Sequence, residues 1–178
     1  MVLLVRFTTA LLLFKKKFLL TTMQLTQFNI RVYGILVTTN NEVLLSDERI
    51  NGTDITKFPG GGLELGEGTR ECLIREYKEE LNLDITVGNH LYTTDYFVQS
   101  AFKPTHQIVS IYYFVSALQV AIAQLTINHK PFAFKKEQLL QYQHTKQIET
   151  HRLIPLQSLT PSMLSMPIDK VVADLIRK

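Results

Sequence analysis

The chain contains 178 residues, of which 46% are apolar and 20% are charged, and its formal net charge is +3. These values describe one ordinary globular domain with a core large enough to be stable alone. Because Cys72 is the only cysteine, an intrachain disulfide is excluded. The composition fits a reducing compartment, and we expect a cytoplasmic protein.

Residues 1–22 differ from the rest of the chain in charge. Arg6 and Lys15–Lys17 give this segment +4 without an acid, which leaves 15 basic and 16 acidic side chains elsewhere. That remainder has no global attraction for nucleic acid or for an anionic membrane. The apolar runs are shorter than the roughly 18–20 residues that span a bilayer, and the order of charge is wrong for a secretory signal. We expect a dispensable or disordered extension, or an upstream start, ahead of the functional domain at residues 23–178. The alternatives are a packed strand or helix and a membrane or organelle address.

The first regular elements are strands. Residues 29–38 are rich in β-branched and aromatic side chains and predict a strand. Asn40 and Asn41 can adopt the left-handed conformations of a tight turn, so residues 42–46 are expected to return as the partner strand. Residues 50–56 are interpreted as a surface loop, and residues 57–59 as a short extended entry into a run of glycines.

A helix is predicted over residues 70–81, with Thr69 as its N-cap. An apolar stripe at helical spacing is formed by Leu73, Tyr77 and Leu81. Asn82 tolerates the left-handed conformation that commonly ends a helix. We therefore expect the helix to stop at this residue.

The remaining elements complete an α+β pattern. Two β-like stretches are predicted, at residues 85–98 and 107–118, and both faces of the second carry apolar side chains. Residues 128–147 are less regular and rich in lysine, and we interpret them as an insertion. A final strand is expected at residues 148–156 and an amphipathic helix at residues 168–177.

The predicted helix concentrates negative charge on one face. Glu76, Glu79 and Glu80 lie at helical spacing, and Glu67 precedes them. Like charges at such spacings destabilise an isolated helix by a few tenths of a kcal/mol each. A cation bound to this face would remove that repulsion, and oxygen-only ligands favour Mg²⁺ or Mn²⁺ over zinc.

The residues from Gly61 to Leu83 resemble the signature of Nudix hydrolases. That signature is a glycine, five residues, a glutamate, seven residues, and then R-E-hydrophobic-x-E-E-x-G-hydrophobic. The matching positions are Gly61, Glu67, Arg75, Glu76, Tyr77, Glu79, Glu80 and Leu83. Such a match arises by chance on the order of once in a hundred thousand for this length. Tyr77 replaces an aliphatic residue and Asn82 replaces the closing glycine, and neither belongs to the acidic cluster.

The resemblance implies a fold and a reaction. The fold would be α+β, an α/β/α sandwich with a mixed β-sheet and the motif helix packed against it. The reaction would be Mg²⁺-dependent cleavage, with Mn²⁺ as the other cation, of a phosphoanhydride bond in a nucleoside diphosphate linked to another moiety. Divalent metal neutralises the phosphate oxygens and orients an attacking water. The expected partner is thus a small nucleotide or nucleotide-like diphosphate, and neither a specific nucleic acid nor a membrane is expected. Dimers are common in the family, so the resemblance also allows a homodimer.

The resemblance also assigns roles by position. The metal ligands would be Gly60, through its carbonyl oxygen, together with Glu76, Glu79, Glu80 and Glu67. Glu76 and Glu80 would be the main ligands, Glu79 a ligand or the general base, and Glu67 would act through a water or support the loop. Arg75 would orient a glutamate through a bidentate pair. The catalytic set is therefore Glu76, Glu79 and Arg75.

Residues outside the signature have two interpretations each. Arg31, Arg49 and Lys57 could bind substrate phosphates, although lysine and arginine are mostly surface charges. Lys130, Lys135, Lys136 and Lys146 could cap a substrate anion or lie in solvent. Glu149 could supply a further acid or lie on the surface. We expect structural or surface roles for all histidines, because none shows metal-ligand spacing.

Two rival functions share the same fold. A catalytically silent nucleotide sensor would bind without metal-dependent product release, and a non-hydrolytic isomerase would convert its substrate without releasing phosphate. The complete acidic cluster favours the hydrolase. Oxidised nucleotides, sugar nucleotides, dinucleoside polyphosphates and capped RNA all stay open as substrates, because the loops outside the signature show no pattern that selects among them.

Overall fold

The computed structural model describes residues 24–128 and 130–177. The predicted extension at residues 1–22 lies outside these ranges. The described residues form two compact units, one of residues 24–29 and 97–108 and one of residues 30–96 and 109–177. In the smaller unit, backbone hydrogen bonds join Thr26 to Thr105 and Ile108 to Val98. The candidate site lies entirely in the larger unit.

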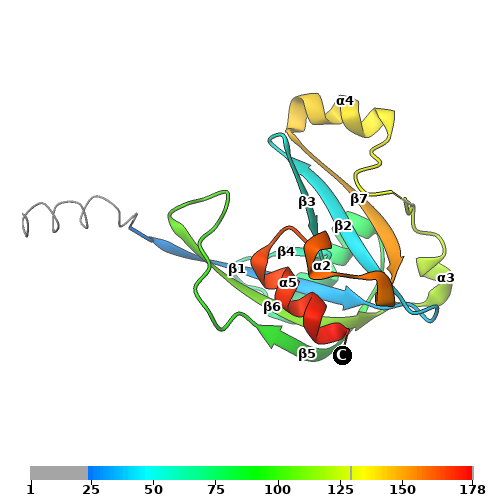
Figure 1. Cartoon of the computed structure of the whole chain (residues 1–178), viewed down its shortest axis with the longest axis horizontal. Coiled ribbons are helices and arrows are strands. Elements are labelled where there is room, and N and C mark those ends of the chain that lie inside the picture. Colours follow the sequence, from blue (N-terminus) through cyan, green and yellow to red (C-terminus); the bar gives the residue numbers. More distant parts are fainter. Residues whose placement is uncertain (1–23, 129, 178) are drawn as a thin grey trace, which may run out of the picture. The chain divides into compact units, whose positions relative to one another are not determined.

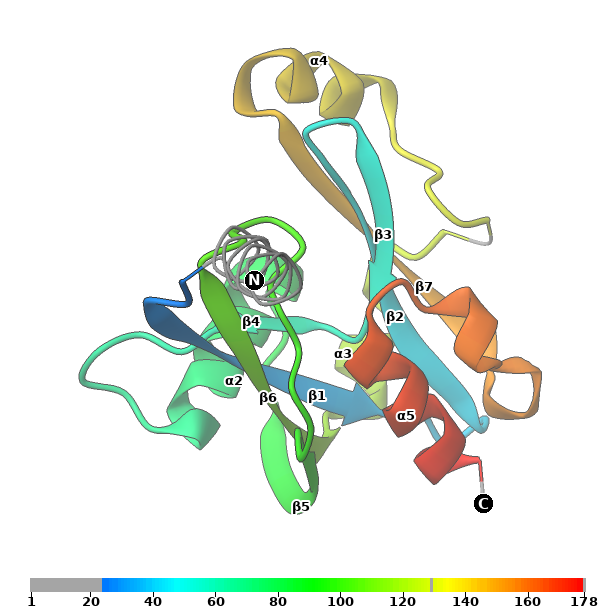
Figure 2. The same ribbon diagram turned by 60° about the vertical axis from the view of Figure 1, so that its left-hand side comes forward.

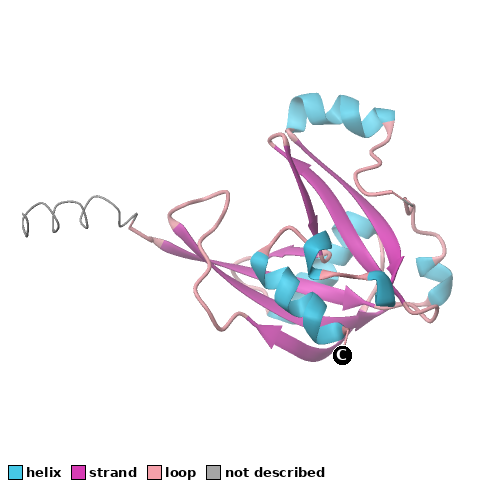
Figure 3. Cartoon of the chain, viewed as in Figure 1, coloured by secondary structure: helices cyan, strands magenta, loops and turns pink. Residues whose placement is uncertain are grey.

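The strands of the described chain form two sheets (Figures 1 and 3). The four-stranded sheet has the order β4-β1-β6-β5 and contains β4 (Gly60–Gly62), β1 (Gln27–Leu36), β6 (His106–Ser116) and β5 (Thr86–Thr93). The three-stranded sheet has the order β3-β2-β7 and contains β3 (Thr53–Lys57), β2 (Glu42–Ile50) and β7 (Gln147–Pro155). β2 pairs antiparallel with both of its neighbours.

The region predicted as a loop at residues 50–56 is instead the tip of a β-hairpin. β2 continues to Ile50, and β3 pairs with it from Thr53 onward. Asn51 and Gly52 form the turn with φ of 48° and 85°. An Asn-Gly pair suits such a two-residue turn because both positions need positive φ. The loop prediction was wrong because Asn51 and Gly52 reverse the chain in two residues, so the polar residues that follow pair with β2 as a strand.

Helix α2 (Thr69–Leu81) carries the acidic cluster. Its N-cap is Gly68, so the prediction of Thr69 was one residue late. The Glu71 carboxylate accepts a hydrogen bond of 2.6 Å from the Gly68 amide, while the Thr69 hydroxyl lies 2.9 Å from the Tyr113 hydroxyl. Asn82 ends the helix with φ 49° and ψ 36°, as predicted for a left-handed residue.

Helices cover both faces of the four-stranded sheet, as contacts of adjacent residues in β6 demonstrate. Neighbouring side chains in a strand point to opposite faces. Tyr113 reaches Thr69 of α2, whereas Tyr112 donates a 2.5 Å hydrogen bond to Asp169. Asp169 belongs to α5 (Pro167–Ile176), which runs beside the strands in Figure 2. The sheet therefore lies between α2 and α5, and the predicted α+β sandwich is confirmed.

The interior beneath α2 is apolar and continuous. Its buried members are Val32, Leu36, Leu44, Cys72, Leu73, Tyr77, Leu83, Val115 and Ile122. The remaining short elements are α3 (Gln119–Ile122), α4 (Lys136–Thr145), η1 (Leu156–Ser158) and η2 (Pro161–Met163). α4 lies within the segment predicted to be less regular. In the described ranges, no helix has the length and apolarity needed to cross a bilayer.

Tyr77, the unusual residue of the signature, fits because the residue that faces it, Gly34, has no side chain. Its ring is fully buried, and its hydroxyl donates a 2.9 Å hydrogen bond to the Gly34 carbonyl. A Cβ at Gly34 would come within 2.7 Å of the Tyr77 ring and hydroxyl. Tyrosine at position 77 thus requires glycine on the neighbouring strand, and the pair fixes the height of α2 above β1.

This complementarity predicts strong coupling between the two positions. Gly34→Ala should lower the free energy of unfolding by about 1–3 kcal/mol, because the added methyl group overpacks the ring. In a Tyr77→Leu background the same change should be much less damaging, since leucine has no ring or hydroxyl there. A double-mutant cycle by urea denaturation measures the coupling, and additive effects would contradict it.

Asp169→Asn should alter the pH dependence of stability. Burial raises the pKa of Asp169 from 3.8 to about 7 in the folded protein. The stability associated with the protonated carboxyl group is thus fully present below the unfolded pKa and is lost as pH rises through the folded pKa. Asparagine cannot ionise, so the variant should gain stability relative to the parent between about pH 4 and pH 8, on the order of a few kcal/mol. Urea denaturation across this range would contradict the assignment if the difference stayed constant.

Candidate functional site

One face of the three-stranded sheet buries polar and charged side chains. Directly paired residues share a face of a sheet, and so do residues two apart in a strand. Ser46 pairs with Lys57 on one side and His151 on the other, and Glu48 pairs with Glu149. These five side chains therefore lie on the same face. Four of these residues are at most 8% exposed, and the Glu149 side chain is 18% exposed, so the charges must compensate one another.

Lys57 supplies most of that compensation. Its Nζ lies 2.8 Å from Glu48 and donates a 2.7 Å hydrogen bond to the Gly60 carbonyl oxygen. Glu149 and Glu80 follow at 3.8 Å and 3.9 Å. Burial alone would lower the pKa of Lys57, but these carboxylates, Glu80 foremost, raise it. The ammonium group is therefore charged and enclosed, and it presents no free side to a substrate phosphate.

Glu80 reaches the same place from the last turn of α2. Its side chain is 19% exposed, and its Oε2 atom is buried with no hydrogen-bond partner among the described residues. Burial raises the pKa of Glu80 to about 8, and the nearby Glu149 and Glu76 act in the same direction while Lys57 opposes them. A buried carboxylate oxygen without a partner is costly. An additional cation at this point would therefore be favourable.

Glu149 differs from Glu80 in that its pKa is lowered rather than raised. Ser46 donates a hydrogen bond to its Oε1 atom, and His151 Nε2 lies 3.6 Å from the same oxygen. Burial would raise the pKa of Glu149, but the contacts with His151, Lys57 and Ser46 outweigh burial and hold it at about 2. The site thus contains two neighbouring carboxylates whose pKa values are displaced in opposite directions.

Arg75 holds the glutamates of the signature together on the exposed side of α2. It forms a bidentate pair with Glu67, at 2.7 Å and 3.1 Å, and this pairing lowers the pKa of Glu67 to about 2. The same guanidinium donates to Glu76 at 3.0 Å and to Glu79 at 3.1 Å. One planar cation therefore sets the positions of three carboxylates.

Two glycines allow the backbone to approach these acids. A Cβ at Gly61 would overlap the Glu76 carboxylate, so only glycine leaves room for that group. Gly60 has φ of +130°, and a Cβ there would meet the backbone of Val32 on β1. Its carbonyl oxygen faces Lys57 Nζ. The predicted backbone ligand and the predicted side-chain ligands are thus neighbours.

The two predicted phosphate-binding arginines lie in different surroundings. Arg31 is opposite Gly62 in the sheet and donates a 3.0 Å hydrogen bond to the Tyr33 hydroxyl. Interaction with Tyr33, and to a smaller extent with Glu48 and Glu76, raises the pKa of Arg31. Arg49 instead points to the other face of β2, where it forms a bidentate pair with Asp54 at 2.6 Å and 2.8 Å. The structure therefore brings Arg31 to the acidic cluster and does not bring Arg49 there.

Sequence reasoning missed two members of the site. Glu48 was given no role, and His151 was expected to be structural or exposed. For Glu149 two interpretations were open, a further acid of the site and a surface charge. The available signal was register: once β2 and β7 are paired, Glu48 stands opposite Glu149, an arrangement of like charges that is unfavourable without a cation nearby. Charge at these strand positions was thus informative only after the pairing was known.

The donor set fits a hard divalent cation. Glu67, Glu76, Glu79, Glu80 and the Gly60 carbonyl offer only oxygen, which Mg²⁺ and Mn²⁺ prefer. The unpartnered Oε2 of Glu80 is the specific sign that the cluster lacks positive charge. Glu80, Glu149 and His151 form a second grouping, because one ligand atom of each lies within 4.8 Å of the others.

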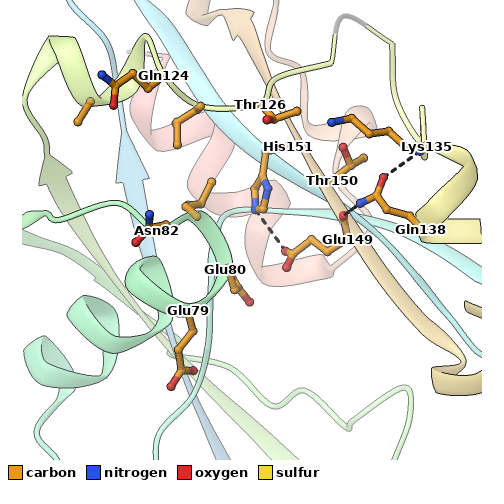
Figure 4. Close-up of a pocket in the computed structure, with 13 residues that line it drawn as sticks. Glu79, Glu80, Asn82, Gln124, Thr126, Lys135, Gln138, Glu149, Thr150 and His151 are labelled. Carbon is orange, nitrogen blue, oxygen red and sulfur yellow. Dashed lines mark hydrogen bonds and ion pairs between the residues drawn. The ribbon is translucent and has the colours of Figure 1, made fainter. Parts of the chain in front are cut away.

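A cavity of about 610 Å³ opens beside these residues (Figure 4). Its walls are the end of α2, the segment after α3, the start of α4 and β7, and its polar lining includes Gln124, Thr126, Lys135, Gln138, Glu149 and His151. This volume suits a nucleotide-sized ligand. Lys135 is thus the one lysine among those predicted for the insertion that lines this cavity.

Comparison with known proteins identifies the family. The model of the NUDIX domain matches residues 28–175. A NUDIX hydrolase from Nitrosomonas europaea has a TM-score of 0.57 at 16% identity, covering 84% of this chain and 88% of its own. A UDP-X diphosphatase has a TM-score of 0.52 at 16% identity, covering 90% of this chain and 65% of its own. The E. coli ORF135 protein has 25% identity and a TM-score of 0.42, covering 51% of this chain and 61% of its own.

The chain therefore spans less than two thirds of the last two proteins. No curated protein matches the sequence. The domain match covers most of the chain, and Arg75, Glu76, Glu79 and Glu80 of the signature lie on α2, which the fold places beside the sheet. The chain belongs to the Nudix family of hydrolases.

Proposed function

We propose that the protein is a Mg²⁺- or Mn²⁺-dependent pyrophosphohydrolase that cleaves a phosphoanhydride bond of a nucleoside diphosphate linked to another moiety. The observation that carries the proposal is the Arg75 fork, which holds Glu67, Glu76 and Glu79 within 3.1 Å of one guanidinium. Carboxylates held this close repel one another, and a bound cation would relieve that repulsion. The UDP-X diphosphatase with a similar fold is named for a compound of the same class.

The roles of the residues follow from their exposure and partners. Glu76, Glu80 and the Gly60 carbonyl would hold the cation, with Glu67 supporting them through Arg75. A bound divalent cation supplies charge neutralisation for the diphosphate oxygens. Glu79 is 61% exposed, so it can meet a water at the mouth of the site and accept its proton. Arg31 is the arginine available to a substrate phosphate.

Lys57 has a different role in this proposal. Because its ammonium group already contacts the Gly60 carbonyl and the acids around it, it acts as an internal counter-charge rather than a substrate contact. It allows the sheet face to fold with several carboxylates before any metal is present. We also propose a cytoplasmic location, because Cys72 is the lone cysteine and a chain without a disulfide suits a reducing compartment.

Glu76→Gln should lower kcat at least about 100-fold with the fold intact, because it removes a charge that the proposed chemistry requires. Release of phosphate or nucleoside monophosphate should be followed with Mg²⁺ for sugar nucleotides, dinucleoside polyphosphates and oxidised nucleoside triphosphates. Asp84→Asn is the matched control, since this acid just beyond α2 has a side chain that is 88% exposed. Near-normal turnover by the Glu76 variant would reject the assignment.

Lys57→Met should destabilise the metal-free protein by about 3–5 kcal/mol, because buried carboxylates lose their partner. Added Mg²⁺ should then recover more stability in the variant than in the parent chain. Thermal unfolding in EDTA and in Mg²⁺ measures both effects, with the exposed Lys170→Met as control. If the methionine variant does not fold, Lys57→Gln provides the comparison. Equal stability without metal would show that Lys57 is no counter-charge.

A further inference from the structure

His151 is a buried group of the site to which the proposed reaction assigns no role. Its Nε2 atom is buried and has no hydrogen-bond partner among the described residues, and the whole residue is only 8% exposed. Glu149 Oε1, an acidic oxygen of the site, lies 3.6 Å away, which is close enough for an ion pair but too long for a hydrogen bond. Buried polar atoms are nearly always satisfied. A ring nitrogen left open in this way indicates a missing partner.

The fold aims three donors at one point. Glu149 and His151 are two residues apart in β7 and share a face of the sheet. Glu80 approaches from the last turn of α2, and its own Oε2 atom also lacks a partner. Figure 4 shows the Glu80, Glu149 and His151 side chains converging, whereas Glu79 points away from them. One ligand atom of each converging residue lies within 4.8 Å of the others.

The groups already present do not fill this position. Lys57 comes no nearer than 3.8 Å to Glu149 and 3.9 Å to Glu80, because Glu48 and the Gly60 carbonyl hold it at 2.8 Å and 2.7 Å. Ser46 donates to Glu149, and Gln138 donates to the backbone carbonyl of Glu149 rather than to its carboxylate. Two acids and an imidazole thus share a space that borders the cavity of about 610 Å³, which gives an ion access.

We propose that Glu80, Glu149 and His151 form a cation site of mixed nitrogen and oxygen donors that prefers Mn²⁺ to Mg²⁺. This inference rests on the proposed function, because Glu80 also belongs to the acidic cluster of the helix. Carboxylate oxygens suit Mg²⁺ and Mn²⁺ alike, but an imidazole nitrogen is accepted more readily by a transition-metal ion such as Mn²⁺ than by Mg²⁺, which favours oxygen donors. His151 therefore decides which divalent cation the site selects, and the oxygen-only ligands around Arg75 do not discriminate in this way.

The test is metal binding to the full chain, followed by electron paramagnetic resonance of Mn²⁺. His151→Gln should weaken Mn²⁺ binding at least about tenfold, since the ring supplies a direct ligand, and should change Mg²⁺ affinity, measured by competition, less than about threefold. Spectra of the bound Mn²⁺ should show coupling to an imidazole nitrogen in the parent chain and lose it in the variant. His144→Gln, at an exposed position on α4, should retain both.

The outcomes separate this inference from the proposed function. Absence of nitrogen coupling in the parent chain, or equal Mn²⁺ affinity in His151→Gln, overturns the site while Mg²⁺-supported hydrolysis can persist. Hydrolysis that fails in the parent chain while nitrogen-coupled Mn²⁺ is bound overturns the reaction and leaves the site standing. If His151→Gln does not fold, His151→Asn serves in its place, and retained nitrogen coupling or an unchanged preference for Mn²⁺ over Mg²⁺ in that variant overturns the inference.

Discussion

Compensation of buried negative charge is the constraint on which the rest of this structure depends. Two cationic side chains provide this compensation. Lys57 lies in the interior and contacts Glu48 and the Gly60 carbonyl. Arg75 lies on the exposed side of α2 and contacts Glu67, Glu76 and Glu79. Glu80 lies nearer to the inner cation, but its second oxygen has no partner in the described chain. The protein thus folds with most, but not all, of its acidic charge balanced. The unbalanced remainder is what a divalent ion can use.

The packing around α2 follows from this constraint. The acids have to lie at a defined height above the sheet, and contacts on the buried side of the helix set that height. Tyr77 reaches the backbone of Gly34, and Gly61 leaves space for the Glu76 carboxylate. One added methyl group beneath α2 would displace the helix, and several carboxylates would move with it. Core packing and the chemistry of the site are therefore not separable at these positions.

The sequence predicts the local part of this arrangement well. Spacing within one segment predicted α2 and its left-handed end at Asn82, because both depend on neighbours along the chain. Glu48 and His151 could not be assigned in this way, since their roles depend on strand pairing between residues about a hundred positions apart. Arg49 and Lys57 show the same limit from the other side. Composition marks both as surface cations. Arg49 is a partly exposed cation on the opposite face of β2, whereas Lys57 lies in the interior.

The hairpin tip at Asn51–Gly52 connects the lysine-rich insertion to the rest of the sheet. The Gly52 amide donates to the Tyr142 hydroxyl at 2.6 Å, and the Asn51 amide donates to the Lys146 carbonyl at 2.9 Å. α4 is thereby fixed at both of these points, while its Gln138 end forms a wall of the cavity. Because Gln138 also donates to the Glu149 carbonyl, a substitution there would alter the cavity wall and the strand that carries this acid together. Lys135 lines the same cavity and uses only its backbone amide to contact Gln138, so its side chain is the place where related chains could diverge in selectivity while keeping the same reaction centre.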